Sequence, residues 1–179
     1  VKVLHGEQKM VIHNPLPTSA TIKAKSKVTG LVDKGADKGA LILTERTLKD
    51  AESGLDLATL TSTTFARGNG GYDGPSDEAP RPHKVPEREP DFAVDLTTLD
   101  MAALIYRLSG DYNPLHASPS VARAAGFPKP ILHGLCSLGV AGHAILKGCC
   151  DYDAKRLKSL QLRFSSPVYP GETMRTEIW

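Results

Sequence analysis

Polar and apolar residues alternate along the first third of the chain. Between residues 18 and 28, small and branched side chains fall on one side (Ala20, Ile22, Ala24, Ser26, Val28) and Thr21 and three lysines fall on the other (Lys23, Lys25, Lys27). A period of two with one polar face predicts a half-buried antiparallel strand. Further extended segments are expected at residues 3–13, 40–48 and 55–65, with turn residues at 30–38.

The pattern changes after residue 96 to a helical one. Apolar residues recur three and four apart from Leu99 to Tyr106, with Thr97 or Thr98 as the expected cap. A short helix is expected between Ser118-Pro119 and Gly126. Residues 133–146 are apolar almost all round, which predicts a helix buried on every face, with His143 buried or half-buried inside it. Two further strands are expected, at 158–164 and 173–178.

The linking segment from Gly68 to Pro90 is rich in glycine, proline and charge, which is typical of a flexible linker. Its Arg67-Gly68 and Gly70-Gly71 steps could instead approach a ligand. The sequence therefore predicts an N-terminal part at 1–68, a linker at 69–90 and a C-terminal part at 91–179. Residues 1–68 contain strands but no helical period, so their sheet lacks a covering helix. We expect the natural chain to extend beyond both ends.

The composition favours a soluble globular protein and excludes several classes. Of the 179 residues, 40% are hydrophobic and 23% charged, and the net charge is only +2. A charge this small does not suit a nucleic-acid surface, and no apolar stretch could cross a membrane. Three cysteines give neither a disulfide framework nor zinc spacing, so a reducing compartment is expected.

The stretch Tyr106–His116 holds the strongest candidate chemistry. It places Asp111, Asn113 and His116 within six residues, between Gly110 and Pro114. An aspartate and a histidine can exchange protons with a substrate and water. Asp, Asn, Gly and Pro are also the usual residues of turns, so an ordinary loop is the alternative interpretation.

These residues resemble the hydratase 2 motif of the MaoC-like family, found in (R)-specific 2-enoyl-CoA hydratases. Within that family, the likeness is nearest to the hydratase 2 part of peroxisomal multifunctional enzymes of type 2. The resemblance extends along nearly the whole chain, through several further segments in the same order: residues 5–8, 14–17, 33–35, 130–136 and 167–173.

The resemblance implies an α+β fold, a double hot-dog in which antiparallel sheets wrap around a central helix, with the first unit lacking its helix here. It implies Asp111 and His116 as the catalytic pair, Asn113 as a residue that holds the reactants, and the Gly134 amide as an oxyanion donor. Substrate contacts are implied for eight further residues: His5, Gly6, Lys34, Tyr112, Pro114, Leu115, His133 and Phe164. For Gly134 and Phe164, simple packing is the alternative, and for Lys34 an ordinary exposed turn.

The implied activity is addition of water across a trans-2-enoyl-CoA in fatty acid metabolism. Coenzyme A would be part of the substrate, with no separate cofactor, and the protein would form a homodimer. The compartment would be the peroxisome in a eukaryote and the cytoplasm in a bacterium. A hot-dog thioesterase and a non-catalytic acyl-CoA-binding protein are the alternative functions.

Other chemistries fit the residues less well. Asp111, His116 and His133 could bind a metal, but no second acidic residue or cysteine shares their spacing, so we expect none. Ser137 lacks the glycine two residues before it that a nucleophile elbow needs. Cys136 is expected to be a core residue rather than a nucleophile.

Overall fold

The computed structural model describes residues 3–76 and 79–179 of the chain. They fold into two compact units. The N-terminal unit contains the described residues up to His83 together with Lys155–Phe164, and the C-terminal unit contains Lys84–Ala154 and Ser165–Trp179. In the part of the chain that the structure describes, no helix has the length and hydropathy needed to cross a bilayer.

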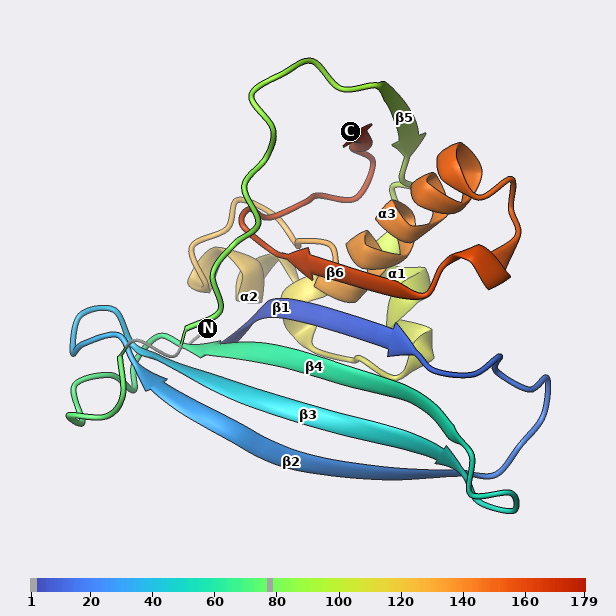
Figure 1. The fold of residues 1–179 in the computed structure, drawn as a ribbon. Coiled ribbons are helices and arrows are strands. Elements are labelled where there is room, and N and C mark those ends of the chain that lie inside the picture. The colour runs from blue at the N-terminus through green and yellow to red at the C-terminus, as the bar shows by residue number, and fades with distance from the viewer. Residues whose placement is uncertain (1–2, 77–78) are drawn as a thin grey trace. The chain divides into compact units, whose positions relative to one another are not determined.

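The N-terminal unit is a five-stranded antiparallel sheet with the order β2-β3-β4-β1-β6 (Figure 1). Four of its strands lie within two residues of their predicted bounds: β1 (Val3–Ile12), β3 (Ala40–Asp50), β4 (Asp56–Ala66) and β6 (Ser159–Arg163). Strand β2 (Ile22–Asp33) begins four residues later and ends five residues later than the predicted strand at 18–28, so it takes up the start of the predicted turn at 30–38. Among its described residues this unit contains no α-helix, as the sequence predicts.

Strand β2 differs from the prediction of a half-buried strand. It is an edge strand, and it is exposed over most of its length, with Val28 62% exposed. Only Val32 and Asp33, at its end, are buried. The alternation fixed which side chains share a face, but burial requires a second layer over that face, and none covers β2 here.

Strand β6 corrects the predicted division of the chain. The sequence places residues 158–164 with the C-terminal half, whereas β6 pairs with β1 from Glu7–Arg163 to Val11–Ser159. At the end of the pair, the Phe164 amide donates to the Gly6 carbonyl over 2.9 Å. The hydrogen-bonding edge of β1 decides this pairing, and a five-residue strand carries no local signal of its partner.

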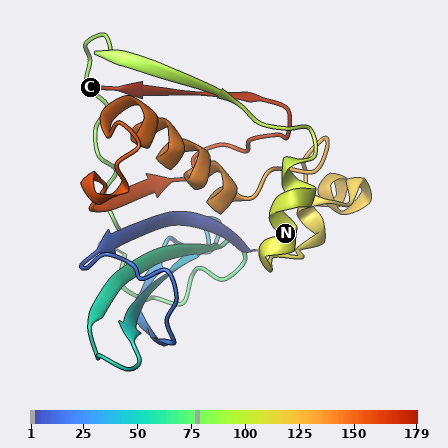
Figure 2. The same ribbon diagram turned by 90° about the vertical axis from the view of Figure 1, so that its right-hand side faces the viewer.

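The C-terminal unit is built around α3 (Gly134–Cys149), which packs on the antiparallel pair β5 (Phe92–Thr97) and β7 (Thr173–Ile178) (Figure 2). Gly148 permits the close approach, because a Cβ there would lie 2.7 Å from the Phe92 ring. The remaining elements are short helical turns: α1 (Ala102–Tyr106), η1 (Arg107–Ser109), η2 (Pro114–His116), α2 (Pro119–Ala124) and η3 (Ala154–Arg156).

Helix α3 has the predicted position but not the predicted burial. Its Ser137, Gly142 and Ala144 are buried, whereas a stripe four residues apart is exposed: Leu135, Gly139, His143 and Lys147. His143 therefore lies outside, where its ring hydrogen-bonds with the Tyr152 hydroxyl over 3.2 Å. The expectation of a helix buried on every face was wrong, because the β5–β7 pair contacts only part of the helix surface.

The start of the C-terminal unit also differs from the prediction. Residues 92–97 form strand β5, and α1 begins at Ala102 without a side-chain cap. Thr98 instead links the ends of the two strands, since its hydroxyl donates to the Glu172 carbonyl and accepts from the Gly171 amide. The sequence carries no local signal for strand β5, because this strand acquires its partner β7 from the far end of the chain.

Candidate active site

The loop before η2 is built from two successive side-chain turns. The Asp111 carboxylate accepts a hydrogen bond from the Asn113 amide over 3.2 Å, and the Asn113 side chain accepts from the Leu115 amide over 3.1 Å. Gly110 enters the loop with φ of 115°, which favours glycine. Asp111 and Asn113 thus act as turn residues, the alternative raised from the sequence, yet Asp111 remains exposed and open to water.

His116 is held in one tautomer. Its Nδ1 lies 2.8 Å from the Ile131 carbonyl oxygen, which can only accept a hydrogen bond. Nδ1 therefore carries a proton, and the Nε2 of the neutral ring has a lone pair. A neutral His116 can consequently take a proton at Nε2, and a protonated His116 can release one there.

His133 lies directly before α3 and is buried, with 2% of its surface exposed. Its ring stacks on His116 with centroids 3.7 Å apart, and its Nε2 lies 3.1 Å from the Asp111 carbonyl oxygen. Burial, and then the neighbouring His116, lower the pKa of His133 below its ordinary value, so the ring is neutral. Tyr106 packs against the same ring at 4.7 Å.

The structure thus brings Asp111, His116 and His133 into one cluster, with one nitrogen or oxygen of each within 4.8 Å of the others. Gly134 follows His133 directly as the first residue of α3. Amides in the first turn of a helix have no partner within the helix and can donate to a group beyond its end. A carboxylate, an imidazole and a helix N-terminus therefore meet at one place in the C-terminal unit.

The same three side chains could in principle hold a metal ion. Two of their ring nitrogens already bond to backbone carbonyls, namely His116 Nδ1 and His133 Nε2. His133 Nδ1 is buried and has no hydrogen-bond partner. A metal would thus have to use His116 Nε2, His133 Nδ1 and the Asp111 carboxylate.

The other expected contacts on this loop lie in different environments. Tyr112 is 60% exposed, and the Arg107 guanidinium lies 5.5 Å from its ring centroid. Leu115 is 2% exposed and belongs to the core of the unit, while Pro114 is the exposed first residue of η2.

Three of the substrate contacts expected in the N-terminal unit lie together. The His5 and Phe164 rings are 5.0 Å apart, and Gly6 sits at an irregularity of β1 where its carbonyl accepts from Phe164. A Cβ at Gly6 would lie 3.1 Å from the Thr63 carbonyl oxygen, so the close packing favours glycine.

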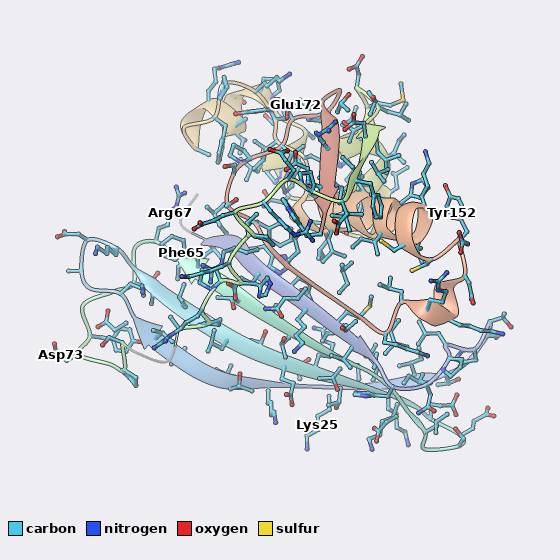
Figure 3. All side chains as sticks on the ribbon, turned by 45° about the horizontal axis from the view of Figure 1, so that its top comes forward. Lys25, Phe65, Arg67, Asp73, Tyr152 and Glu172 are labelled. Carbon is cyan, nitrogen blue, oxygen red and sulfur yellow. The ribbon has the colours of Figure 1, made fainter. Side chains whose placement is uncertain are left out.

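Lys34 lines a separate hollow of about 420 Å³ in the N-terminal unit, at the β2–β3 turn. Its other lining residues are Asp37, Lys38, Leu41, Phe65 and Arg67, of which Phe65 and Arg67 are labelled at the end of β4 in Figure 3. No motif in the sequence marks Lys38, Leu41 or Phe65 as candidate site residues. Leu41 and Phe65 become neighbours only through the pairing of β3 with β4, and no local pattern in the sequence predicts that register.

Comparisons with known proteins agree with this architecture. Residues 82–179 match the model of the MaoC like domain, and residues 1–68 match that of the MFE-2 hydratase 2 N-terminal domain. The chain is 44% identical to the 3-hydroxyacyl-thioester dehydratase Y of Mycobacterium tuberculosis and 42% identical to the peroxisomal enoyl-CoA hydratase 2 of Arabidopsis thaliana, each over 99% of its length. It spans 61% and 60% of those relatives.

A crystal structure of a MaoC-like dehydratase from Phytophthora capsici superposes with a TM-score of 0.90 at 46% identity, covering 99% of this chain and 62% of that one. A second solved structure, whose title describes a double hot-dog fold, shares the fold at 14% identity with a TM-score of 0.60. The predicted fold class is therefore confirmed, and the chain belongs to the MaoC-like family.

Proposed function

We propose that this chain catalyses the (R)-specific hydration of trans-2-enoyl-CoA and the reverse dehydration of (3R)-hydroxyacyl-CoA. The observation that carries the proposal is the cluster of Asp111 and His116 beside the first residue of α3. The named relatives act on thioesters of this kind, as 3-hydroxyacyl-thioester dehydratase and enoyl-CoA hydratase 2.

Hydration requires a base, an acid and a place for negative charge. The water oxygen bonds to C3 while the base removes one of its protons, and the electron pair of the double bond moves toward the thioester oxygen. The acid then delivers a proton to C2, and the carbonyl re-forms. One molecule of water is consumed, and the net charge does not change.

Asp111 and His116 divide the base and acid roles between them. The exposed Asp111 carboxylate accepts from Asn113 and can also accept a proton of the attacking water. His116 presents Nε2 to the reaction, because its Nδ1 proton is committed to Ile131. A protonated Nε2 can supply the C2 proton, and the dehydration direction uses the same groups in reverse.

The Gly134 amide is placed to donate to the thioester oxygen as its charge develops. An oxyanion donor of this kind stabilises the transition state by about 3 kcal/mol in other enzymes. A glycine at this position leaves room for the close approach of a carbonyl group. Asn113 would hold the loop and thereby the reactants.

Two sites of the N-terminal unit suit different parts of the substrate. Lys34, Lys38 and Arg67 give the hollow three positive charges against the single negative charge of Asp37, beside the apolar Leu41 and Phe65. The excess of positive charge suits the phosphates of coenzyme A, and the apolar side chains suit its adenine ring. His5, Gly6 and Phe164 form an apolar and aromatic cluster that suits the acyl thioester. Since the sheet has no helix among its described residues, its open face would accommodate the acyl chain.

The decisive experiment is a hydration assay with trans-2-enoyl-CoA substrates of increasing chain length. Loss of enoyl absorbance with formation of the 3R product supports the proposal. Free coenzyme A in its place would identify a thioesterase, and binding without any product would identify a non-catalytic acyl-CoA-binding protein. Activity that survives chelator treatment would support the expectation that no metal takes part.

We further propose that the protein acts as a homodimer in fatty acid β-oxidation, as the resemblance of its sequence motifs to the hydratase 2 family implies. The molecular mass in solution, measured by light scattering, tests the dimer. A monomeric mass at assay concentrations, with full activity, would contradict it.

A further inference from the structure

Among the residues described, His133 contacts both members of the proposed catalytic pair. Its Nε2 bonds to the backbone carbonyl of Asp111, and its ring lies 3.7 Å from that of His116 with an angle of 26° between the planes. It also directly precedes Gly134, whose amide is the proposed oxyanion donor. One buried ring thus joins all three parts of the site.

The chemistry of the ring explains why a histidine is needed there. The Asp111 carbonyl can only accept, so Nε2 carries the proton and Nδ1 has the lone pair. Nδ1 is buried without a partner, which is unfavourable in a protein interior. A phenyl ring could fill the space and stack on His116 without that penalty, so packing alone does not account for the imidazole. The hydrogen bond to Asp111 does.

The direction of this hydrogen bond matters for catalysis. It fixes the backbone of Asp111 rather than its carboxylate, so the carboxylate is oriented without losing any lone pair to the contact. Asp111 is also held locally, by the hydrogen bond that the Asn113 amide donates to the Asp111 carboxylate. His133 therefore helps to tie the exposed loop to the buried start of α3, together with the bond from His116 to the Ile131 carbonyl.

We propose that His133 is a positioning residue, which holds Asp111 and His116 in their reactive arrangement through the N–H bond to the Asp111 carbonyl. This inference rests on the proposed hydratase activity. In place of the direct substrate contact that the family resemblance implies for His133, the buried ring acts through the two residues it contacts.

Two substitutions separate the hydrogen bond from the packing. His133→Phe keeps an aromatic ring against His116 and removes the N–H donor. His133→Gln keeps an N–H at a similar reach and removes the aromatic ring. A displacement of about 1 Å at a reacting group lowers rates by roughly a hundredfold. We expect His133→Phe to lower kcat by about 10- to 100-fold with little change in KM or thermal stability, and His133→Gln to recover most of the loss.

The matched control is His143→Phe, which makes the same change at an exposed position of α3 and should leave kcat unchanged. A double-mutant cycle with Asp111→Asn provides a readout that a purely structural role would not alter. Because His133 acts through Asp111, substitution of His133 should lower kcat only slightly further in a protein that already carries Asp111→Asn.

The outcomes are distinct. A wild-type protein without hydration activity would overturn the proposed function itself. With an active wild type, full activity in folded His133→Phe would overturn the positioning role, as would equal losses in the Phe and Gln variants. If His133→Phe does not fold, His133→Asn, whose N–H has a shorter reach, takes its place in the cycle with Asp111→Asn, and independent, additive losses would contradict the proposal.

Discussion

Two aspartates, one in each unit, begin similar turns but lie in opposite environments. Asp33 and Asp111 both accept a hydrogen bond from the amide two residues later, at Gly35 and Asn113. Asp33 is buried and accepts two more, from the amides of Gly71 and Tyr72, whereas Asp111 is exposed. The amides, with Gly71 contributing most, lower the pKa of Asp33 below its ordinary value.

This difference distinguishes a carboxylate that stabilises the fold from one that is free to take part in a reaction. The lone pairs of Asp33 are used to fasten the segment after β4 to the end of β2, so this part of the predicted linker is held in place. The Asp33 amide also donates to the Pro75 carbonyl. Asp111 has one such bond, and its remaining lone pairs are available for water. A carboxylate can act as a base only if the fold leaves it incompletely bonded.

The largest expected effect is on the chemistry of Asp111. Asp111→Asn should lower the hydration rate by about 100- to 10,000-fold, since the amide cannot take a proton from water. The melting temperature should change little, because Asn can still accept from the Asn113 amide. Enoyl-CoA hydration and thermal unfolding are measured on the same sample.

Asp95→Asn is the control for this change, because Asp95 is an exposed carboxylate of the same unit, paired with Arg175. A surface pair of this kind adds little stability. His116→Ala should lower the hydration rate by a factor comparable to that of Asp111→Asn. The rate of the double mutant should fall by less than the product of the two single factors. Full activity in a stable Asp111→Asn variant would contradict the assignment of the base.

A smaller effect is expected where the N-terminal unit binds substrate. Lys34→Ala should raise KM for enoyl-CoA about tenfold with little change in kcat, because it removes a charge for a phosphate but none of the reacting groups. Lys25→Ala is the control, since Lys25 lies on the exposed strand β2 (Figure 3). Equal KM values in the two variants would show that the hollow does not bind the coenzyme.

The loss of Asp33 should affect stability and not chemistry. Asp33→Ala removes a buried carboxylate that accepts from the amides of Gly35, Gly71 and Tyr72, so the melting temperature should fall by several degrees. Turnover per folded molecule should be retained. A variant with normal melting temperature but reduced turnover would reverse the roles assigned to the two aspartates.

The contribution of Asp33 to stability should also depend on pH. Because folding lowers its pKa, the ionised form is favoured in the folded state, and this stabilisation is present above the ordinary value of 3.8. It is lost as the pH falls through the lower pKa of the folded state. The difference in melting temperature between wild type and Asp33→Ala should therefore be constant near neutral pH and shrink below about pH 4. A difference that stays constant down to pH 2 would contradict this linkage.

The smallest effect is the change in stability expected from a substitution on the exposed stripe of α3. Gly139→Ala should raise stability by about 0.5–1 kcal/mol, because alanine favours the helix and no atom lies within 4 Å of the new Cβ. Gly70→Ala is the contrasting case in the N-terminal unit, where the Cβ would lie 2.1 Å from the Gly35 carbonyl oxygen. Denaturant unfolding should show opposite signs for the two variants, and destabilisation by Gly139→Ala would mean that the stripe is covered in solution.

The close approach at Gly70 also resolves an alternative that the sequence left open. The glycines after β4 could have served a ligand, and in the structure Gly70 meets the backbone of the β2–β3 turn instead. The sequence raised a close approach there only as the alternative to a flexible linker. Only the fold showed that the partner is the chain itself.

The sequence by itself determined the features that depend on neighbours along the chain. Alternation placed β3, β4 and β7 within two residues of their ends, and apolar periodicity placed α3 within three. The loop chemistry of Asp111 to His116 was visible because its residues lie within six positions of one another. The tertiary structure alone decided which edge β6 pairs with, that residues 92–97 form a strand, and which stripe of α3 is exposed.

The two aspartates show, at the level of single residues, that the local sequence does not determine which groups folding brings together. Asp33 and Asp111 have the same local turn signal, and the additional acceptors of Asp33 are satisfied by amides 38 and 39 residues away. Local periodicity and turn chemistry depend on a few adjacent residues, whereas pairing, burial and proton affinity depend on groups that folding brings together. The sequence therefore identified candidate groups, and the tertiary structure decided which carboxylate remains free to react.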